Sequence, residues 1–434
     1  MKQLTKAIEP VAWAVFLAGV VVLAGCPRSA PPEKEAGQRQ GPSAEATASR
    51  ASTSPGGVVS EERILEHVRI SETGPAWSVT RIERCPLVWT RQVLGPADGD
   101  DQSQIAGAWQ QLTTVLTKAH CSVDRIVRLN VVASSEETLA AAIQFLDKVF
   151  RPGLEPAVTY VVSPLPRKGV KIGLDAVAVP GEDVDVVNRW ESENLDGLNL
   201  TDAIVTPAGG LVFFSGQPDK SPLPQAAANA LHGLLETAQG LQVSQEDILQ
   251  LRVFVQTATE AAQVFQEIEK AFSGKAIPPV VYTEWIASAP VEIEMVARLP
   301  EKAVEGSAPL RFYNPPSVKP SPTFTRVVLV QTDRVIFLPG LVSRQAGPAD
   351  AQAADVFKQL GDLLGNQGSD WQHLAKATYF VTDKDASAAI DAIRPKFFAP
   401  DRPPAASKVT VHSVGWKDRS LSVDMIAVPV SPGL

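Results

Sequence analysis

The sequence predicts an α/β (α+β) fold made of three similar units, each a mixed sheet with two helices on one face. The main observation is an apolar, strand-like segment that occurs three times, at residues 126–132, 248–255 and 374–381. These segments begin 122 and 126 residues apart. The segments that flank them repeat as well. A nearly constant period with repeated flanks is typical of tandem structural repeats.

Each unit opens with a short apolar strand, at residues 87–90, 211–215 and 335–338. An amphipathic helix follows, because apolar residues then recur every three or four positions. The apolar positions are Ile105, Trp109, Leu112, Val115 and Leu116; Ala228, Leu231, Leu234, Leu235 and Ala238; and Val356, Phe357, Leu360, Leu363 and Leu364.

A second amphipathic helix follows each central strand and ends near Phe150, Phe272 or Phe397. Two more strands complete the unit. The first begins with proline, at residues 156–159, 278–281 and 404–407, and the closing strand lies at 171–178, 291–297 and 420–427. The closing strands carry an acid at a shared position, which is Asp175, Glu294 or Asp424. These acids either position a water molecule in a cleft or face solvent in an alternating strand.

These patterns divide the chain into six segments. Residues 1–26 form a signal peptide, 27–57 a tether without ordered structure, and 58–180, 195–300 and 323–430 the three units, with a proline-rich linker at 301–322. Residues 181–200, rich in Asp and Glu, and residues 301–322 are interpreted as surface linkers rather than strands or helices.

The N-terminus resembles that of a bacterial lipoprotein. Lys2 and Lys6 precede an apolar run that stops at Cys26, and residues 23–26 resemble a lipobox, in which the cysteine thiol takes the lipid. The alternative is a transmembrane anchor, for which the run is short. We therefore expect a lipid-anchored, periplasmic or otherwise extracytoplasmic protein of the cell envelope.

Composition argues against several other classes. The net charge of −8 gives no general positive field for nucleic acid. The histidines and cysteines lack metal-ligand spacing, so we expect no metal, and glycine-rich nucleotide motifs do not occur, so we expect no cofactor. Cys85 and Cys121 either form a disulfide or are buried free thiols.

The second unit carries the motifs of a known family. Residues 214–217 read Phe-Ser-Gly-Gln, a helix with Asn229 follows, and residues 291–297 read Val-Glu-Ile-Glu-Met-Val-Ala. These motifs resemble the RidA/YjgF family of reactive-intermediate deaminases, formerly labelled L-PSP endoribonucleases. The resemblance implies chorismate-mutase-like repeats, homotrimers with a central barrel and ligand clefts between subunits. Three units on one chain would form an intrachain pseudotrimer and need no homotrimer.

The resemblance also implies a site, but one essential residue is missing. Active members hold the substrate carboxylate with an arginine, for which this chain has Val158, Val280 and, with a one-residue ambiguity, Ala406. Arg91 and Lys408 lie near these positions and either supply a substitute cation or, in the favoured interpretation, are solvated surface residues. The candidate cleft residues are Ser215, Gly216, Glu294, Asp175 and Asp424, although Ser215 and Gly216 alternatively serve only a turn.

Three functions follow from this pattern. The first is a small-molecule-binding or scaffold protein without deaminase activity. The second is a diverged enamine or imine deaminase that positions water with the acids of its closing strands. The third is a structural protein that presents its exterior to a protein partner.

Overall fold

The computed structural model describes residues 62–70, 78–191, 201–316 and 318–430, and the predicted helices form within them. The first helices of the three units are α1 (Asp101–Lys118), α3 (Gln225–Gly240) and α5 (Ala349–Asn366). The second helices are α2 (Glu136–Val149), α4 (Ala261–Ala271) and α6 (Lys384–Ile393). N-cap residues define where α1, α2 and α6 begin. The side chains of Asp100, Ser135 and Asp383 each accept a hydrogen bond from a backbone N–H of the first turn.

The predicted mixed sheets are confirmed. The central strands are β5 (Ile126–Ala133), β11 (Ile248–Val255) and β17 (Leu374–Val381). Each pairs in parallel with the proline-led strand, which is β6 (Ala157–Val162), β12 (Val280–Glu284) or β18 (Ala405–Thr410). On its other edge each pairs antiparallel with the closing strand, β7 (Ile172–Ala178), β13 (Val291–Arg298) or β19 (Leu421–Ala427).

The opening strands carry a register break at corresponding places. They are β3 (Leu87–Thr90), continued by β4 (Val93–Leu94), then β10 (Leu211–Asp219) and β16 (Arg334–Val342). In β10 the pairing with β13 shifts between Phe214 and Gln217, and in β16 the pairing with β19 shifts between Leu338 and Leu341. A break of this kind lets two residues leave the ladder and approach a neighbouring segment.

The order of strands and helices predicted from the sequence is wrong in one respect, because it omits one strand in each unit. A strand precedes each opening strand: β2 (Ser78–Glu83), β9 (Thr201–Thr206) and β15 (Val327–Val330). Each pairs with the opening strand of another unit, since β9 pairs with β3, β15 with β10, and β2 with β16 of the third unit. The three units are thereby joined in a ring by backbone hydrogen bonds.

The two predicted linkers are also corrected. Strand β8 (Asn188–Glu191) lies in the first and pairs with β9, and strand β14 (Leu310–Tyr313) lies in the second and pairs with β15. A further strand, β1 (Ile64–Arg69), pairs with β2. These strands add edges to sheets of six, six and seven strands. The sequence did not predict β8 and β14 because their neighbours are acidic or rich in proline.

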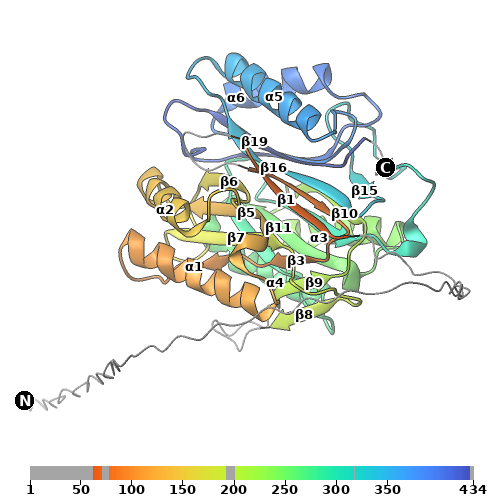
Figure 1. The fold of residues 1–434 in the computed structure, drawn as a ribbon, viewed down its shortest axis with the longest axis horizontal. Coiled ribbons are helices and arrows are strands. Elements are labelled where there is room, and N and C mark those ends of the chain that lie inside the picture. Colours follow the sequence, from red (N-terminus) through yellow and green to blue (C-terminus); the bar gives the residue numbers. More distant parts are fainter. Residues whose placement is uncertain (1–61, 71–77, 192–200, 317, 431–434) are drawn as a thin grey trace, which may run out of the picture. The chain divides into compact units, whose positions relative to one another are not determined.

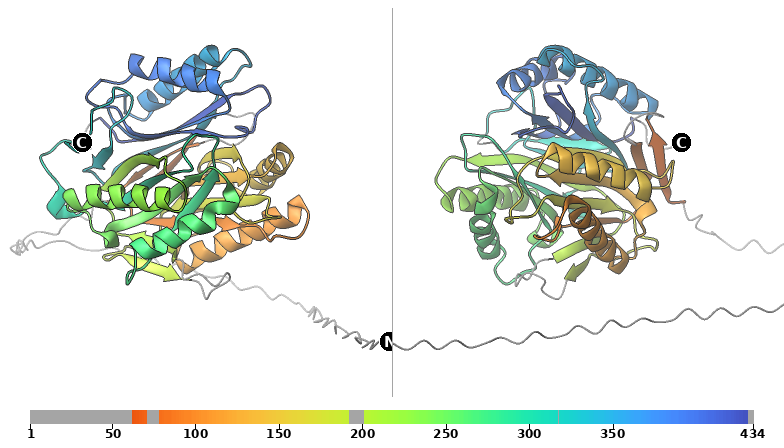
Figure 2. Two further views of the ribbon diagram at one scale, coloured as in Figure 1. Left: turned by 180° about the vertical axis from the view of Figure 1, so that it is seen from behind. Right: turned by 90° about the vertical axis from the view of Figure 1, so that its left-hand side faces the viewer.

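The inner faces of the three sheets share one apolar core. Figures 1 and 2 show the helix pairs on the outer sides of their sheets. Trp89, Phe213 and Phe337, at matching positions of β3, β10 and β16, are at most 1% exposed and belong to one cluster with residues of all three units. The described residues, from 62 to 430 with the gaps given above, form one compact unit.

The predicted signal peptide, Cys26 and the tether lie outside the described residues. No helix in the part of the chain that the structure describes is long and apolar enough to cross a membrane.

Candidate functional site

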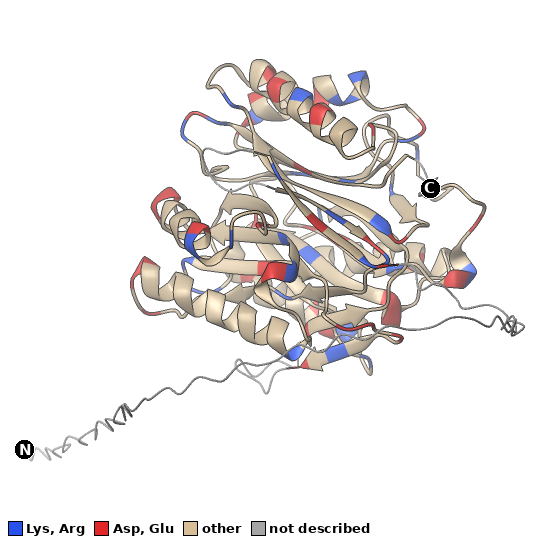
Figure 3. Ribbon diagram, in the orientation of Figure 1, with Lys and Arg blue, Asp and Glu red and all other residues tan. Residues whose placement is uncertain are grey.

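The acids of the closing strands lie inside the protein and form ion pairs between units. Asp175, Glu294 and Asp424 are 1%, 5% and 1% exposed, which contradicts the solvent-facing alternative. The paired groups are Arg252 Nη2 with Asp175 Oδ1 at 3.1 Å, Lys376 Nζ with Glu294 Oε2 at 2.5 Å, and Arg128 Nη2 with Asp424 Oδ1 at 2.9 Å. Each bond joins a cation of one unit to an acid of another. Figure 3 shows charged positions on strands as well as on helices.

The environment of Glu294 favours its charged form. Burial alone would raise the pKa of Glu294, but Lys376 and Arg252 stabilise the carboxylate, and the resulting pKa lies below its ordinary value. The Ser407 hydroxyl also donates a hydrogen bond to it at 2.6 Å. None of the three acids lines a cavity described below. Their positions therefore suit holding the units together.

Ser215 and Gly216 occupy the register break of β10 and contact the third unit. Ser215 Oγ donates to the Thr325 carbonyl oxygen at 2.6 Å and accepts from the Ala406 N–H at 2.7 Å. A Cβ on Gly216 would lie 1.9 Å from Glu292 Oε1. A side chain at this position would therefore have to displace the Glu292 carboxyl group. These two residues build a junction between units, and neither lines the cavities described below.

Glu292, which the sequence analysis did not select, lies at this junction with an unusual pKa. Burial raises the pKa of Glu292 to about 7, while the nearby cations Lys376 and Arg326 oppose the shift. The neutral form is thus the one that the folded protein favours.

This shift predicts a pH dependence of stability. Because the pKa of Glu292 is higher in the folded protein, neutral Glu292 stabilises the fold. This contribution to stability is complete below about pH 4.5 and is lost as the pH rises through 7. Between pH 5 and pH 8 the free energy of unfolding of the unaltered chain should fall by up to about 3 kcal/mol because of this group. We expect Glu292→Gln to lack this decrease, measured by urea unfolding at both pH values. Glu236→Gln, at an exposed glutamate of α3, is the control. An unchanged dependence in Glu292→Gln would contradict the assignment.

The three positions that lack the arginine correspond in the sheets. Val158 is paired with Leu129, Val280 with Leu251 and Ala406 with Ala377, at the same register of the parallel ladders. The one-residue ambiguity at Ala406 is thereby resolved. All three side chains are buried.

A cleft of about 300 Å³ lies at one of these positions, between the first and second units. Its walls are mostly apolar, with Leu94 from the first unit and Ala261, Phe265 and Val280 from the second. Tyr282 also lines this cleft, and its hydroxyl oxygen is buried and has no hydrogen-bond partner in the described structure. Burial raises the pKa of Tyr282, so the phenol stays protonated. The cleft thus offers mostly apolar surface, with Arg167, Gln266 and Glu269 also in its lining.

Side chains of the first unit close one side of this cleft. Gln92 Nε2 donates to the Tyr282 carbonyl oxygen at 3.0 Å, and the Gln92 N–H donates to that of Val280 at 3.1 Å. Arg91 pairs with Asp202 at 2.6 Å, and its side chain is only 13% exposed. The solvated-surface interpretation of Arg91 is therefore wrong. Lys408 is 26% exposed and pairs with Asp391 at 2.6 Å.

The cysteine alternative is resolved in the described residues. Cys85 and Cys121 are free and buried, which confirms the buried-thiol alternative, and burial raises the pKa of Cys121 to about 12. The described residues contain no group of three His, Cys, Asp or Glu side chains suited to a metal ion.

Comparison with known proteins gives the following matches. Residues 317–429 match the family described as Endoribonuclease L-PSP. A RutC family protein of Synechocystis sp. is 34% identical over 82 residues, 19% of this chain and 62% of that protein, so the chain spans less than two thirds of its length. The family match falls on the third unit, whereas the motifs were clearest in the second.

Solved structures give similar but more distant matches. A YjgF family protein of Neisseria meningitidis is 23% identical, with 28% of this chain and 97% of that chain covered and a TM-score of 0.22. A Rid family protein of unknown function from Yersinia pestis is 21% identical, with 28% and 99% covered and a TM-score of 0.26.

Proposed function

We propose that this chain, whose residues 317–429 match the endoribonuclease L-PSP family, is an intrachain pseudotrimer of RidA/YjgF-like units that binds a small molecule and lacks deaminase activity. The ligand site is the cleft between the first and second units. The observation that carries this proposal is Val280, which gives the cleft an apolar wall where a carboxylate-binding arginine would stand. The ligand would be a small, mostly apolar molecule, because most of the accessible surface of the cleft is apolar.

The proposal includes a membrane tether and no homotrimer. The lipobox at residues 23–26 supports acylation of Cys26 and a location on the cell envelope. The contacts of the three units with one another support a ring complete within one chain. Metabolic labelling with a radioactive fatty acid is expected to mark the full-length chain but not Cys26→Ser.

Binding is tested with an uncharged fluorescent probe, N-phenyl-1-naphthylamine, on the full chain. Ala262 lines the cleft on the exposed side of α4, and Ala388 holds the corresponding exposed position of α6. We expect Ala262→Trp to weaken probe binding at least tenfold, because the indole fills the cleft, and Ala388→Trp to leave it unchanged. Equal binding by both variants would contradict the assignment of the ligand to this cleft.

The deaminase alternative rests on a different junction. Glu292 is a buried carboxyl group with a pKa of about 7, next to Gly216 and Ser407, and such a group can exchange a proton at neutral pH. The full chain should be compared with Val158→Arg, Val280→Arg, Ala406→Arg and Glu292→Gln for hydrolysis of an enzymatically generated 2-imino acid. We expect the unaltered chain to react at the background rate. Acceleration that Glu292→Gln abolishes would instead support the deaminase.

A further inference from the structure

A second cavity lies away from the cleft, between helix α3 and the end of strand β14. Its volume is about 570 Å³, and it is called the α3 cavity below. Its lining includes Gln217 from β10, Gly233 and Glu236 from α3, Tyr313 from β14 and Arg326, which immediately precedes β15. It shares no lining residue with the cleft.

Arg326 is the unusual group in this cavity. Its side chain is partly buried, its Nε is buried without a hydrogen-bond partner, and no described residue accepts a hydrogen bond from the guanidinium. The group lies over the Phe324 ring, 5.2 Å from its centre, and Glu292 attracts it only electrostatically. A partly buried guanidinium with unused donors is suited to an anion.

A smaller cavity lies at the corresponding place beside helix α1 of the first unit. It is lined by Gln111, Thr114, Val115 and Lys118, each 122 residues before Gly233, Glu236, Thr237 and Gly240 of the α3 cavity. Its volume is about 220 Å³. The Gln111 side chain crosses to the Leu94 carbonyl oxygen at 3.0 Å, whereas Gly233 has no side chain and a Cβ there would lie 2.5 Å from Gln217 Oε1.

The two cavities also differ in the charges of their equivalent residues. In the smaller cavity Asp202, from the second unit, stands where Arg326, from the third unit, stands in the α3 cavity, and Arg91 stands where Ser215 stands. Arg91 and Asp202 neutralise each other at 2.6 Å. In the second unit Ser215 instead bonds the backbone of the third unit, so it provides no charge for Arg326. The cation is therefore left available.

We propose that the α3 cavity binds a small organic monocarboxylate through the guanidinium of Arg326. A carboxylate matches the planar donor fork of arginine, whereas the Glu236 carboxyl group in the same cavity disfavours a dianion such as phosphate. Tyr313, Pro315 and Val318 provide apolar surface for the rest of the molecule. This site is separate from the proposed function.

The test uses saturation-transfer NMR on the full chain with benzoate, and with benzamide as its uncharged counterpart. We expect a signal from benzoate only. Arg326→Gln should weaken the binding of benzoate at least tenfold, since a charge-assisted hydrogen bond is lost. Gly233→Gln should do the same by copying Gln111 of the first unit, because the atom that its Cβ meets is the movable end of Gln217. Arg311→Gln, at a β14 arginine that pairs with Glu305, should change nothing.

Further variants separate folding and the cleft from this site. Arg326→Lys keeps the charge but not the fork, and its benzoate affinity should lie between those of the unaltered chain and Arg326→Gln. Ala262→Trp, which blocks the cleft, should leave the benzoate signal unchanged. The proposal would be overturned by an unchanged signal in Arg326→Gln, by loss in Ala262→Trp, or by the absence of benzoate binding to the unaltered chain.

Discussion

Replacing Glu294 by glutamine is expected to lower the free energy of unfolding by about 3 to 5 kcal/mol, because Lys376 is then a buried cation without its anion. The Lys376 and Glu294 side chains are 4% and 6% exposed, and their charged atoms lie 2.5 Å apart. The deaminase hypothesis based on the strand acids makes the opposite prediction, namely that turnover is lost while the fold stays intact. Urea unfolding of the variant distinguishes the two.

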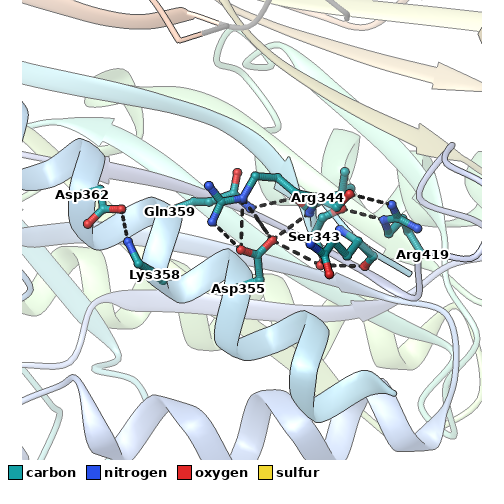
Figure 4. A network of polar contacts seen from close by, with 9 residues as sticks. Ser343, Arg344, Asp355, Lys358, Gln359, Asp362 and Arg419 are labelled. Carbon is teal, nitrogen blue, oxygen red and sulfur yellow. Dashed lines mark hydrogen bonds and ion pairs between the residues drawn. The ribbon is translucent and has the colours of Figure 1, made fainter. Parts of the chain in front are cut away.

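An exposed ion pair of the same charge type provides the control. Lys358 and Asp362 of α5 are 2.6 Å apart but 67% and 59% exposed, beside the Arg344–Asp355 network of Figure 4. We expect Asp362→Asn to change stability by no more than about 0.5 kcal/mol. The pair replacement Lys376→Met with Glu294→Leu should recover most of the loss, because no unpaired charge remains. A Glu294→Gln protein as stable as Asp362→Asn would refute the structural role.

The local pattern of the sequence predicted the strands and helices that follow a clear period. Helices α1 to α6 and the central strands are long enough to show it. Strand β15, with four residues, and β14, among prolines and a glycine, are too short. Their existence depends on pairing with strands far away in sequence, which periodicity does not contain.

The acids illustrate the same limit at the candidate site. Alternation along a strand gave the positions of Asp175, Glu294 and Asp424 but not what lies opposite them. Their partners, such as Arg128 for Asp424, come from another unit. Comparison of equivalent positions was the available signal, because Arg128 and Lys376 are both the third residue of a central strand. The same comparison shows an arginine, Arg326, at the position equivalent to Asp202, and this difference points to the α3 cavity.

The shared core leads to the second large effect. Phe337→Ala is expected to lower the free energy of unfolding by about 3 to 5 kcal/mol, because the phenyl ring is fully buried and its neighbours can fill the space only in part. Its cluster contains Trp89 and Phe213 of the other two units. The cavity therefore weakens all three units at once, and we expect one cooperative transition by calorimetry and by circular dichroism.

Phe357→Ala tests whether the units unfold together. Phe357 is equally buried but packs within the third unit, between α5 and its own sheet. If the ring of exchanged strands couples the units, this variant must move the same single transition as Phe337→Ala, since the third unit cannot unfold without releasing β2 and the central core. Two transitions, of which Phe357→Ala moves only one, would mean that the units are independent despite β2, β9 and β15. The ion pairs of Glu294 and Asp424 would then belong to interfaces that open before the units unfold.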